Sequence, residues 1–380
     1  MVNKLISKCS ETSTNPLKKY QKKNLAAAIV VPALFCSACG LMESVEVAEL
    51  QDNGNDVEFT KTLRMANVYE PNHAANRCGT ATMKKELAKV GIELKVYPGS
   101  QLGNEMETVE QVVTGALDIG MSTGAFFANW YPEAVVVDVP FFVEDAETYD
   151  KVMRGKTMTQ FYEEMADETG LEVYSSWLYG TRHITSNKPI RNPEDLRGVK
   201  IRTPDAPMYL QMMEAFGGTA TPMALTEVYL GLQQGTIDAQ ENPIPTIYSN
   251  KFNEVQSTLN LTGHIIQGVQ VFTSSDLLES LTEDEASALK AATDKARVAN
   301  FECIKSGEVE ILETWKKDGS IEIVDDVDQS KFQSAIEQRL LSDQEWASIY
   351  ERVQDEIDSG ITTVVGEDIK SSLLGEQIEG

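Results

Sequence analysis

The chain has 380 residues, of which 42% are hydrophobic and 24% are charged, proportions that suit about two globular domains. Its 33 basic and 59 acidic residues give a formal net charge of −26, which argues against nucleic acid or an anionic membrane surface as a partner. Beyond residue 38 no apolar run is long enough to cross a membrane as a helix.

The N-terminus reads as an export signal. Four lysines at positions 18, 19, 22 and 23 precede the apolar run LAAAIVVPALFCSA at 25–38, which is short for a membrane span and typical of a secretory signal. We therefore expect residues 1–40 to direct the protein to the periplasm. Cys39 stands where a lipoprotein is acylated, although Cys36 replaces the usual Leu. Lipid attachment, plain cleavage near Ala38 and a retained anchor all stay open.

Five cysteines are present, and only Cys78 and Cys303 lie in the part of the chain that we expect to fold. An exported protein permits a disulfide between these two residues. Two separate buried thiols on helices are the alternative.

The first part of the fold is predicted to alternate strands and helices after an acidic linker at 41–57. These elements are expected over 59–68, 74–90, 92–97, 105–114 and 116–122. Glu70 and His73 lie in the loop after the first strand. A later strand over 171–179 leads to Gly180-Thr181-Arg182.

The stretch 198–243 predicts two strands separated by two helices. Val199 to Arg202 alternates apolar and charged residues, as a half-buried strand does. Asp205 can cap a helix that ends at Gly217, and a second helix runs from 226 to 235. A strand over 236–240 then leads into Glu241-Asn242-Pro243. Arg202 and Asn242 would therefore lie at strand ends, where ligands bind in open α/β sheets.

The last third of the chain is predicted to hold two strands and a long helix. The strands are expected over 255–261 and 263–274. Thr282 and Glu285 form a capping box for a helix that extends toward Lys317, longer than most globular helices. The last sixty residues are acidic and read as helical.

Two segments share a helix–Gly–strand pattern: VEQVVTGALDIG at 109–120 and YLGLQQGTIDAQ at 229–240. A weak internal repeat of this kind suits two similar α/β lobes that face a cleft. Because helix–Gly–strand turns are common, the repeat alone decides little.

Five motifs occur in order along the chain: YPGSQLGNEMETVEQVVTGALDIG at 97–120, GTRHITSNKPI at 180–190, GVKIR at 198–202, TPMALTEVY at 221–229 and LQQGTIDAQENP at 232–243. Together they resemble the substrate-binding proteins, of the DctP type, of tripartite ATP-independent periplasmic (TRAP) transporters. The resemblance covers roughly residues 60–310.

The resemblance implies an α/β fold of two lobes, a type II-like periplasmic binding protein with a hinge and a long helix spanning both lobes. Each lobe would have its own mixed sheet. We expect lobe I to comprise 58–179 plus 268–307, and lobe II to comprise 180–267 plus 308–380. Ligand would bind between the lobes, and closure would bury it.

In the family, the Arg of the KIR motif clamps the ligand carboxylate, and Arg202 holds that position here. A guanidinium fork matches a carboxylate in a bidentate manner. Arg182 would add a second positive contact and Asn242 an amide contact. The structural alternatives are that Arg202 bridges to an acidic residue and that Arg182 forms a surface salt bridge.

Six further residues complete the expected site. Some relatives carry an acidic residue at the end of the strand where this chain has Ser122 and Thr123, which argues against a sialic-acid-like extension of the ligand. The pocket walls would include, with core packing as the alternative for the first two, Trp177, Leu225, Glu70 and His73.

No motif for catalysis is present: the three histidines form no zinc pattern, and no nucleophile elbow, Walker loop or dinucleotide fingerprint occurs. We therefore expect a binding protein without cofactor or metal, not an enzyme. The partners implied by the resemblance are a small organic carboxylate and a TRAP membrane permease, with the protein itself a monomer. A ligand-sensing periplasmic protein and a periplasmic enzyme are the alternatives.

Overall fold

A single mixed sheet organises residues 58–340 and 344–366, which are the residues that the computed structural model describes. The strand order is β2-β1-β3-β8-β4-β7-β5-β6, with β9 beside β8. The strands have these bounds: β1 Lys61–Ala66, β2 Ile92–Tyr97, β3 Ile119–Ser122, β4 Leu171–Ser186, β5 Lys200–Thr203, β6 Thr219–Pro222, β7 Ala239–Pro243, β8 Thr258–Ser274 and β9 Glu322–Val324. The export signal, the linker and Cys39 lie outside the described residues.

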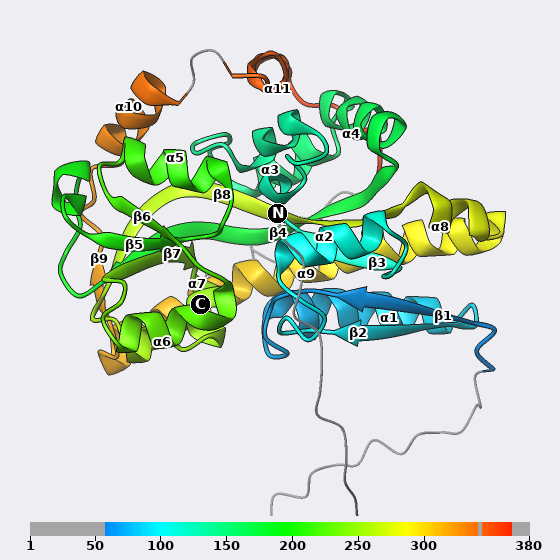
Figure 1. The fold of residues 1–380 in the computed structure, drawn as a ribbon, viewed down its shortest axis with the longest axis horizontal. Helices are drawn as coiled ribbons and strands as arrows, with labels where there is room; N and C mark the ends of the chain where they lie inside the picture. The colour runs from blue at the N-terminus through cyan, green and yellow to red at the C-terminus, as the bar shows by residue number, and fades with distance from the viewer. Residues whose placement is uncertain (1–57, 341–343, 367–380) are drawn as a thin grey trace, which may run out of the picture. The chain divides into compact units, whose positions relative to one another are not determined.

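Two long antiparallel strands, β4 and β8, run through the centre of the molecule and join its two sides (Figure 1). On one side they meet β1–β3, and on the other they meet β5–β7 and β9. The expected sheet of each lobe is thus hydrogen-bonded into one shared sheet. The chain is an α/β protein of two lobes with a hinge, and β4 and β8 are the strands common to both.

Glycines explain why these two strands are longer than the sequence indicates. We expected a strand to end near residue 179 and another to break at 262, yet β4 continues to Ser186 and β8 is unbroken. Gly180 has φ +125° and Gly263 has φ +55°, conformations that L side chains rarely adopt. Each strand bends at its glycine without ending. The β4–β8 register also shifts between Leu178 and Gly180.

Helices and short helical turns cover both faces of the sheet. Their bounds are η1 Ala75–Thr80, α1 Ala81–Ala88, α2 Glu105–Val113, η2 Gly124–Phe126, η3 Pro132–Asp138, α3 Ala146–Met153, α4 Lys156–Thr169, η4 Pro193–Leu196, α5 Pro207–Ala215, η5 Leu225–Glu227, α6 Val228–Gln233, α7 Ile244–Ser249, η6 Phe252–Glu254, α8 Ser275–Ser280, α9 Glu283–Asp318, α10 Gln329–Arg339 and α11 Ala347–Ser359. No helix among residues 58–340 and 344–366 has the length and apolar character of a membrane span.

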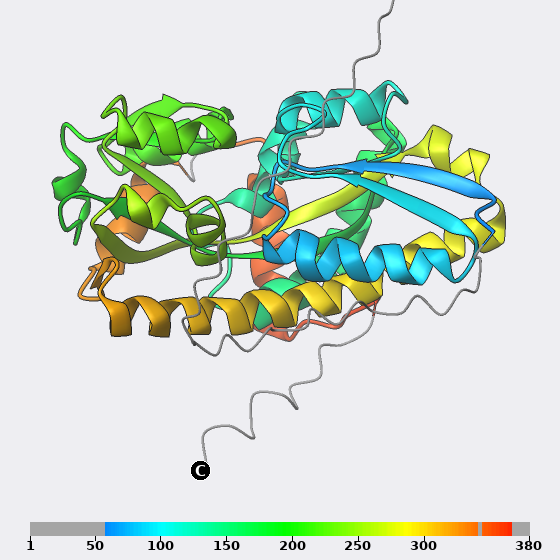
Figure 2. The ribbon, with the colours of Figure 1, turned by 90° about the horizontal axis from the view of Figure 1, so that it is seen from below.

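The helix α9 has 36 residues and begins at the predicted capping box, in which Thr282 and Glu285 exchange side-chain and backbone hydrogen bonds. It contacts η1, α1 and β4 on one side of the molecule and α7 and β9 on the other. Figure 2 shows it running along the edge of both halves. The expectation of a long helix spanning both lobes is confirmed.

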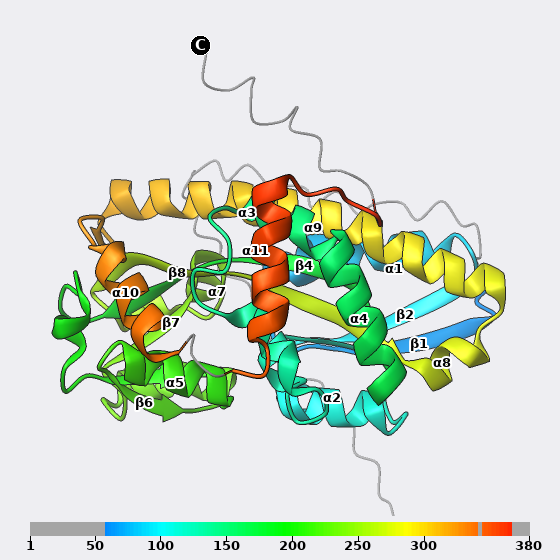
Figure 3. The same ribbon diagram turned by 90° about the horizontal axis from the view of Figure 1, so that it is seen from above.

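The two C-terminal helices pack on different sides of the molecule. In Figure 3, α11 crosses the middle and lies beside α4, while α10 lies near α5. The helix α11 packs on α4 and η3, although we had placed 308–380 in lobe II. The bounds of the lobes remain a prediction.

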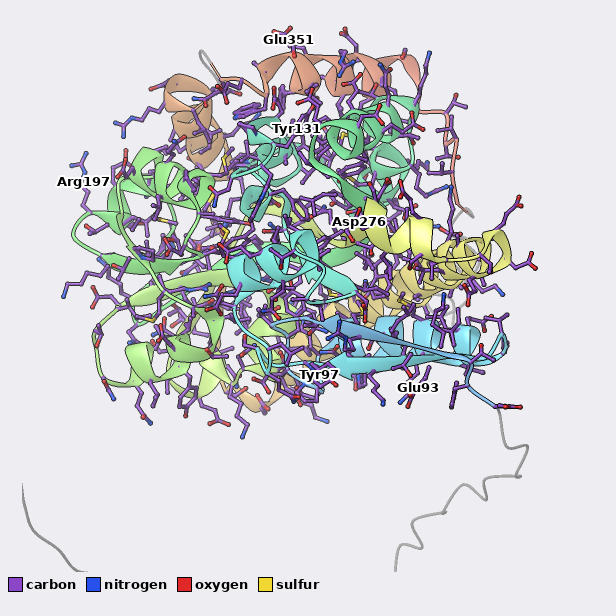
Figure 4. The ribbon with its side chains drawn as sticks, turned by 45° about the vertical axis from the view of Figure 1, so that its right-hand side comes forward. Glu93, Tyr97, Tyr131, Arg197, Asp276 and Glu351 are labelled. Carbon is purple, nitrogen blue, oxygen red and sulfur yellow. A yellow bond between two sulfur atoms is a disulfide. The ribbon has the colours of Figure 1, made fainter. Side chains whose placement is uncertain are left out.

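Figure 4 shows Glu93 on β2 and Arg197 before β5 on opposite sides of the fold.

The expected cap of α5 is wrong. The N-cap is Ala206, which makes no side-chain capping bond, and Pro207 occupies the first helical position. A proline there has its φ already set for a helix and lacks only an N–H that would have no partner. Proline therefore starts this helix in place of Asp205.

A disulfide joins Cys78 in η1 to Cys303 in α9, across 225 positions of sequence. It ties η1, which follows the loop with Glu70 and His73, to the long helix. The two cysteines that the sequence left open are therefore bonded, as an exported protein permits.

Candidate functional site

Arg182 lies in the middle of β4, opposite Pro243 of β7 and Ile265 of β8. Its guanidinium is bound by Glu241: Nε donates to Oε2 at 2.5 Å, and Nη2 donates to Oε1 at 2.6 Å and to the backbone oxygen at 2.8 Å. Nη1 donates to Gln267 Oε1 at 2.7 Å. Because a guanidinium has five N–H donors, this arrangement leaves one for any other partner.

The Arg182–Glu241 pair is buried and is completed by a histidine. Burial alone would raise the pKa of Glu241, but the Arg182 charge and a hydrogen bond from His264 lower it to about 2. His264 Nε2 lies 3.2 Å from Glu241 Oε2, and Nδ1 lies 2.7 Å from Thr262 Oγ1. Since an ionised carboxylate only accepts, Nε2 carries the proton. Burial lowers the pKa of His264, so the ring is neutral.

Arg202, on β5, has a different environment. Its Nε and Nη2 both donate to the backbone oxygen of Met223, at 2.9 and 2.6 Å. Among the described residues no carboxylate lies within 4.0 Å of its guanidinium, and Nη1 has no hydrogen-bond partner. The side chain is 2% exposed, and burial lowers its pKa while the charges of Glu105 and Glu241 oppose that shift. Arg202 is thus a buried cation, and three of its five N–H groups have no acceptor among the described residues.

Glu105 is a half-buried residue that lies close enough to both arginines for their charges to act on its pKa, and the sequence analysis did not single it out. It is the first residue of α2, after the N-cap Asn104, whose capping box with Glu107 leaves the Glu105 side chain free of the cap. Burial raises the pKa of Glu105, and the charges of Arg202 and Arg182 act against that rise. A signal was present, since GNEMET belongs to the first matched motif.

Asn242 lies on β7 beside Arg182, as predicted for a strand end. Its Oδ1 accepts from Tyr179 Oη at 3.0 Å, and its Nδ2 donates to Gln240 Oε1 at 2.7 Å. One amide N–H therefore has no acceptor among the described residues. The strand ends at Pro243, which has φ −66° and ψ 153° and so is extended.

His73 belongs to an aromatic cluster rather than to the open surface of a cleft. Its ring stacks on Tyr69 at 5.0 Å and lies 5.7 Å from Tyr179. Nδ1 accepts from the backbone N–H of Ala75, and Nε2 lies 3.1 Å from Thr246 Oγ1. Burial lowers its pKa to about 3, so the ring is neutral and Nε2 is the donor to Thr246.

Ser122 and Thr123 point in different directions, because successive side chains of an extended chain alternate. Thr123 Oγ1 receives a hydrogen bond from Tyr209 of α5 at 3.3 Å. Ser122, which pairs with Gln270 of β8, is fully buried and its Oγ has no partner among the described residues. Among the described contacts of these two residues, only that of Thr123 reaches α5.

Trp177 and Leu225 have different surroundings. The Trp177 indole is fully buried, donates to the backbone oxygen of Thr293 in α9 and lies directly against Gly79, so we assign it to the core. Leu225 lines a cavity of about 430 Å³ together with Glu70. A second cavity, of about 770 Å³, lies between α4, β4 and α9.

Neither of these two cavities is lined by Arg182, Arg202 or Asn242. All three side chains are 2% exposed. The three candidate ligand-binding side chains are therefore buried together and lie outside both of these cavities.

Residues 79–346 match the family described as bacterial extracellular solute-binding protein, family 7. The chain belongs to this family. Its members are solute-binding proteins of transporters rather than enzymes, and this chain is a TRAP solute-binding protein. The resemblance found in the sequence motifs is thereby confirmed.

Three relatives illustrate the similarity. The sialic acid-binding periplasmic protein of Vibrio cholerae is 32% identical over 235 residues, 62% of this chain and 73% of that protein. The 2,3-diketo-L-gulonate-binding periplasmic protein of Escherichia coli is 33% identical over 253 residues, covering 66% and 76%. A TRAP periplasmic solute-binding protein from Polaromonas sp. JS666, solved bound to D-erythronate, has a TM-score of 0.73 and 31% identity, covering 77% of this chain and 98% of that one.

Proposed function

We propose that this protein captures a sugar acid in the periplasm and delivers it to the membrane permease of a TRAP transporter. The observation that carries the proposal is Arg202, a buried guanidinium with free donors and no carboxylate partner among the described residues. A buried charge is costly unless it is paired, and a ligand carboxylate would pair it. The names of the three relatives also refer to carboxylic acids.

The free donors define how the carboxylate would be held. Arg202 offers an N–H of Nη1 and the second N–H of Nη2, which together form one edge of the planar guanidinium. Arg182 adds one N–H, and the Asn242 amide adds another. The proposed clamp is therefore Arg202, with Arg182 and Asn242 in supporting roles.

Glu105 favours hydroxylated monocarboxylates over dicarboxylates. It lies where its charge acts on both arginines. A carboxylate accepts hydrogen bonds from ligand hydroxyl groups but repels a second ligand carboxylate. We infer that Glu105 supplies the acidic group that is absent at Ser122 and Thr123, so a polyhydroxylated extension of the ligand remains compatible with this chain.

Ligand binding would shift the equilibrium between open and closed lobes. Only a contact made more strongly in the closed form can do this. Arg182 lies on β4, between the two register shifts at Leu178/Gly180 and Arg182/Ile184, and β4 is shared by both lobes. Small-angle scattering should therefore show a smaller radius of gyration with ligand than without it.

Export completes the proposal. The signal at 1–40 would be removed, leaving a monomer that begins near residues 39–41 and is free or anchored through Cys39. Intact mass of protein from the native envelope tests this. We expect a mass without residues 1–38, with or without a diacylglycerol increment, and a mass that retains them would overturn it.

A ligand screen tests the function. Thermal-shift measurements against about a hundred organic acids should find hits among aldonates and uronates, because a ligand that binds only the folded state raises the melting temperature. C4-dicarboxylates should shift it less. Hits confined to dicarboxylates or amines would contradict the proposed ligand class. Uptake of a hit into vesicles holding the TRAP permease should require this protein.

A further inference from the structure

Tyr209 is a fully buried residue of α5 whose hydroxyl group bridges distant segments. Its Oη accepts from Gln267 Nε2 at 2.5 Å and donates to Thr123 Oγ1 at 3.3 Å. The Arg182 guanidinium carbon lies 5.4 Å from the centre of the Tyr209 ring, a distance typical of a cation–π contact. The side chain therefore contacts one of the proposed ligand arginines directly.

Gln267 carries this contact further. Its Oε1 accepts from Arg182 Nη1 at 2.7 Å, while its Nε2 also donates to Asp138 Oδ1 at 2.6 Å. Asp138 is completely buried at the end of η3, and its Oδ2 accepts from the backbone N–H of Ala125. Burial raises the pKa of Asp138 to about 6, while hydrogen bonds from Gln267 and Ala125 oppose the rise. One glutamine thus joins Arg182, Tyr209 and Asp138.

These residues come from different parts of the fold. Tyr209 lies on α5, which packs on β5 and β6, whereas Thr123 follows β3 and Asp138 ends η3. Gln267 lies on β8, the strand shared by both sides. The hydrogen bond from Tyr209 to Thr123 therefore crosses between the β5–β7 side and the β1–β3 side. It exists only while those two sides are close together.

We propose that Tyr209 is a positioning residue that holds the closed arrangement and so couples lobe closure to ligand binding at the site formed by Arg202 and Arg182. This inference rests on the proposed function for its ligand, but the contact itself needs none. When the lobes open, the Tyr209 hydroxyl loses Thr123. Ligand held at the arginines and the Tyr209–Thr123 bond both favour the closed form, and removal of either makes opening easier.

The test uses Tyr209→Phe, which removes one oxygen and keeps the ring over Arg182. Tyr149→Phe is the matched control, because Tyr149 is also buried and its hydroxyl bonds Ser176 at 2.8 Å between α3 and β4, on one side of the molecule only. Binding of a sugar-acid hit is measured by calorimetry and stopped-flow. Tyr209→Phe should weaken affinity about three- to tenfold through faster dissociation. Tyr149→Phe should leave affinity within about twofold.

Thr123→Val supplies a second, independent variant. It removes the acceptor from the same bond, so the double variant with Tyr209→Phe should lose little more than either single one. Additive losses would mean that the two residues act separately and would overturn the proposal. Equal affinity for Tyr209→Phe and wild type would overturn it as well.

A ligand-free measurement separates this inference from the proposed function. Small-angle scattering without ligand should give a larger radius of gyration for Tyr209→Phe than for wild type and Tyr149→Phe. A wild type that binds no carboxylate would refute the proposed function and leave this comparison intact. Identical ligand-free radii for all three proteins would refute the role of Tyr209.

Discussion

The two buried arginines of this protein have opposite surroundings. Arg182, at the crossing of β4, β7 and β8, gives four of its five N–H groups to Glu241 and Gln267. Arg202, on β5, gives two to a single backbone oxygen, and no described carboxylate pairs with it. Both side chains are 2% exposed. Equal burial therefore accompanies a satisfied charge in one case and an unsatisfied charge in the other.

The difference separates a structural role from a binding role. A buried pair that is hydrogen-bonded throughout fixes the local arrangement but has little left to offer a ligand. A buried charge without a partner destabilises the empty protein and gains most when an anion arrives. We therefore propose that Arg182 orders the crossing of the strands and that Arg202 supplies the main contact to the ligand carboxylate.

The largest expected effect comes from breaking the satisfied pair. Glu241→Gln leaves the Arg182 charge buried without its carboxylate, and we expect the free energy of unfolding to fall by about 3–5 kcal/mol. Urea denaturation measures it. Arg191→Gln is the control, because the Arg191–Asp326 pair has a 2.8 Å contact but two exposed partners, so its loss should lower the stability much less. Equal losses for the two variants would contradict the structural role of Arg182.

The unsatisfied arginine should behave in the opposite way. Arg202→Met removes a buried unpaired charge and keeps much of the volume, so the ligand-free protein should gain about 1–2 kcal/mol of stability while losing ligand binding. Denaturation without ligand and calorimetry with it check both halves. A variant that is less stable than wild type would show that Arg202 has a structural role after all.

Glu105 sharpens the comparison from the ligand side. Glu105→Gln removes the negative charge that acts on both arginines, so affinity for a dicarboxylate should rise relative to a sugar acid by about tenfold. Competition calorimetry with one ligand of each class measures the ratio. Glu107→Gln, in the same turn of α2, is the control. An unchanged ratio would remove Glu105 from the site.

The smallest expected effect on stability comes from Glu308, a buried carboxyl group that forms no salt bridge with the described residues. Burial raises the pKa of Glu308 to about 7, although the backbone N–H of Thr181 donates to it, whereas Glu241 has a pKa of about 2. The folded state therefore holds a proton that the unfolded state releases above pH 4.5. The stability that this retained proton gives the folded state is present at low pH and is lost as the pH rises through about 7. Denaturation at pH 4.5 and 7.5 measures how much stability each protein loses over that range. The loss should be smaller in Glu308→Gln than in wild type by on the order of 1 kcal/mol. An equal loss in the two proteins would contradict this.

Much of the fold was predictable from local patterns. The capping box at Thr282 and the glycine after α2 act through neighbouring residues, so the sequence alone indicates them. The single sheet was not predictable in the same way. Whether β4 ends at residue 179 or continues depends on Gly180 and on its pairing with β8, almost ninety positions away. Pairing over that distance leaves no periodic signal.

The site shows the same division. The KIR and QENP motifs pointed to Arg202 and Asn242, because both lie at predicted strand ends within the resemblance, and their role in binding stays a prediction. The binding of Arg182 by Glu241 and the position of Glu105 needed the three-dimensional arrangement, since 59 acidic residues offer many possible partners. Trp177 was open to both readings, and its contact with Gly79 assigns it to the core.

The central claim is that Arg202, rather than Arg182, clamps the ligand carboxylate. Calorimetry on four combinations tests it most directly: wild type and Arg202→Lys, each with a sugar acid and with its methyl ester. Lysine keeps the charge but cannot form the paired fork. We predict that wild type binds the ester about a hundredfold or more weakly than the acid. Arg202→Lys should bind the acid weaker than wild type by a similar factor. In this variant, the acid and the ester should bind with nearly equal affinity. An Arg202→Lys variant that binds the acid within threefold of wild type would contradict the account and direct attention to Arg182.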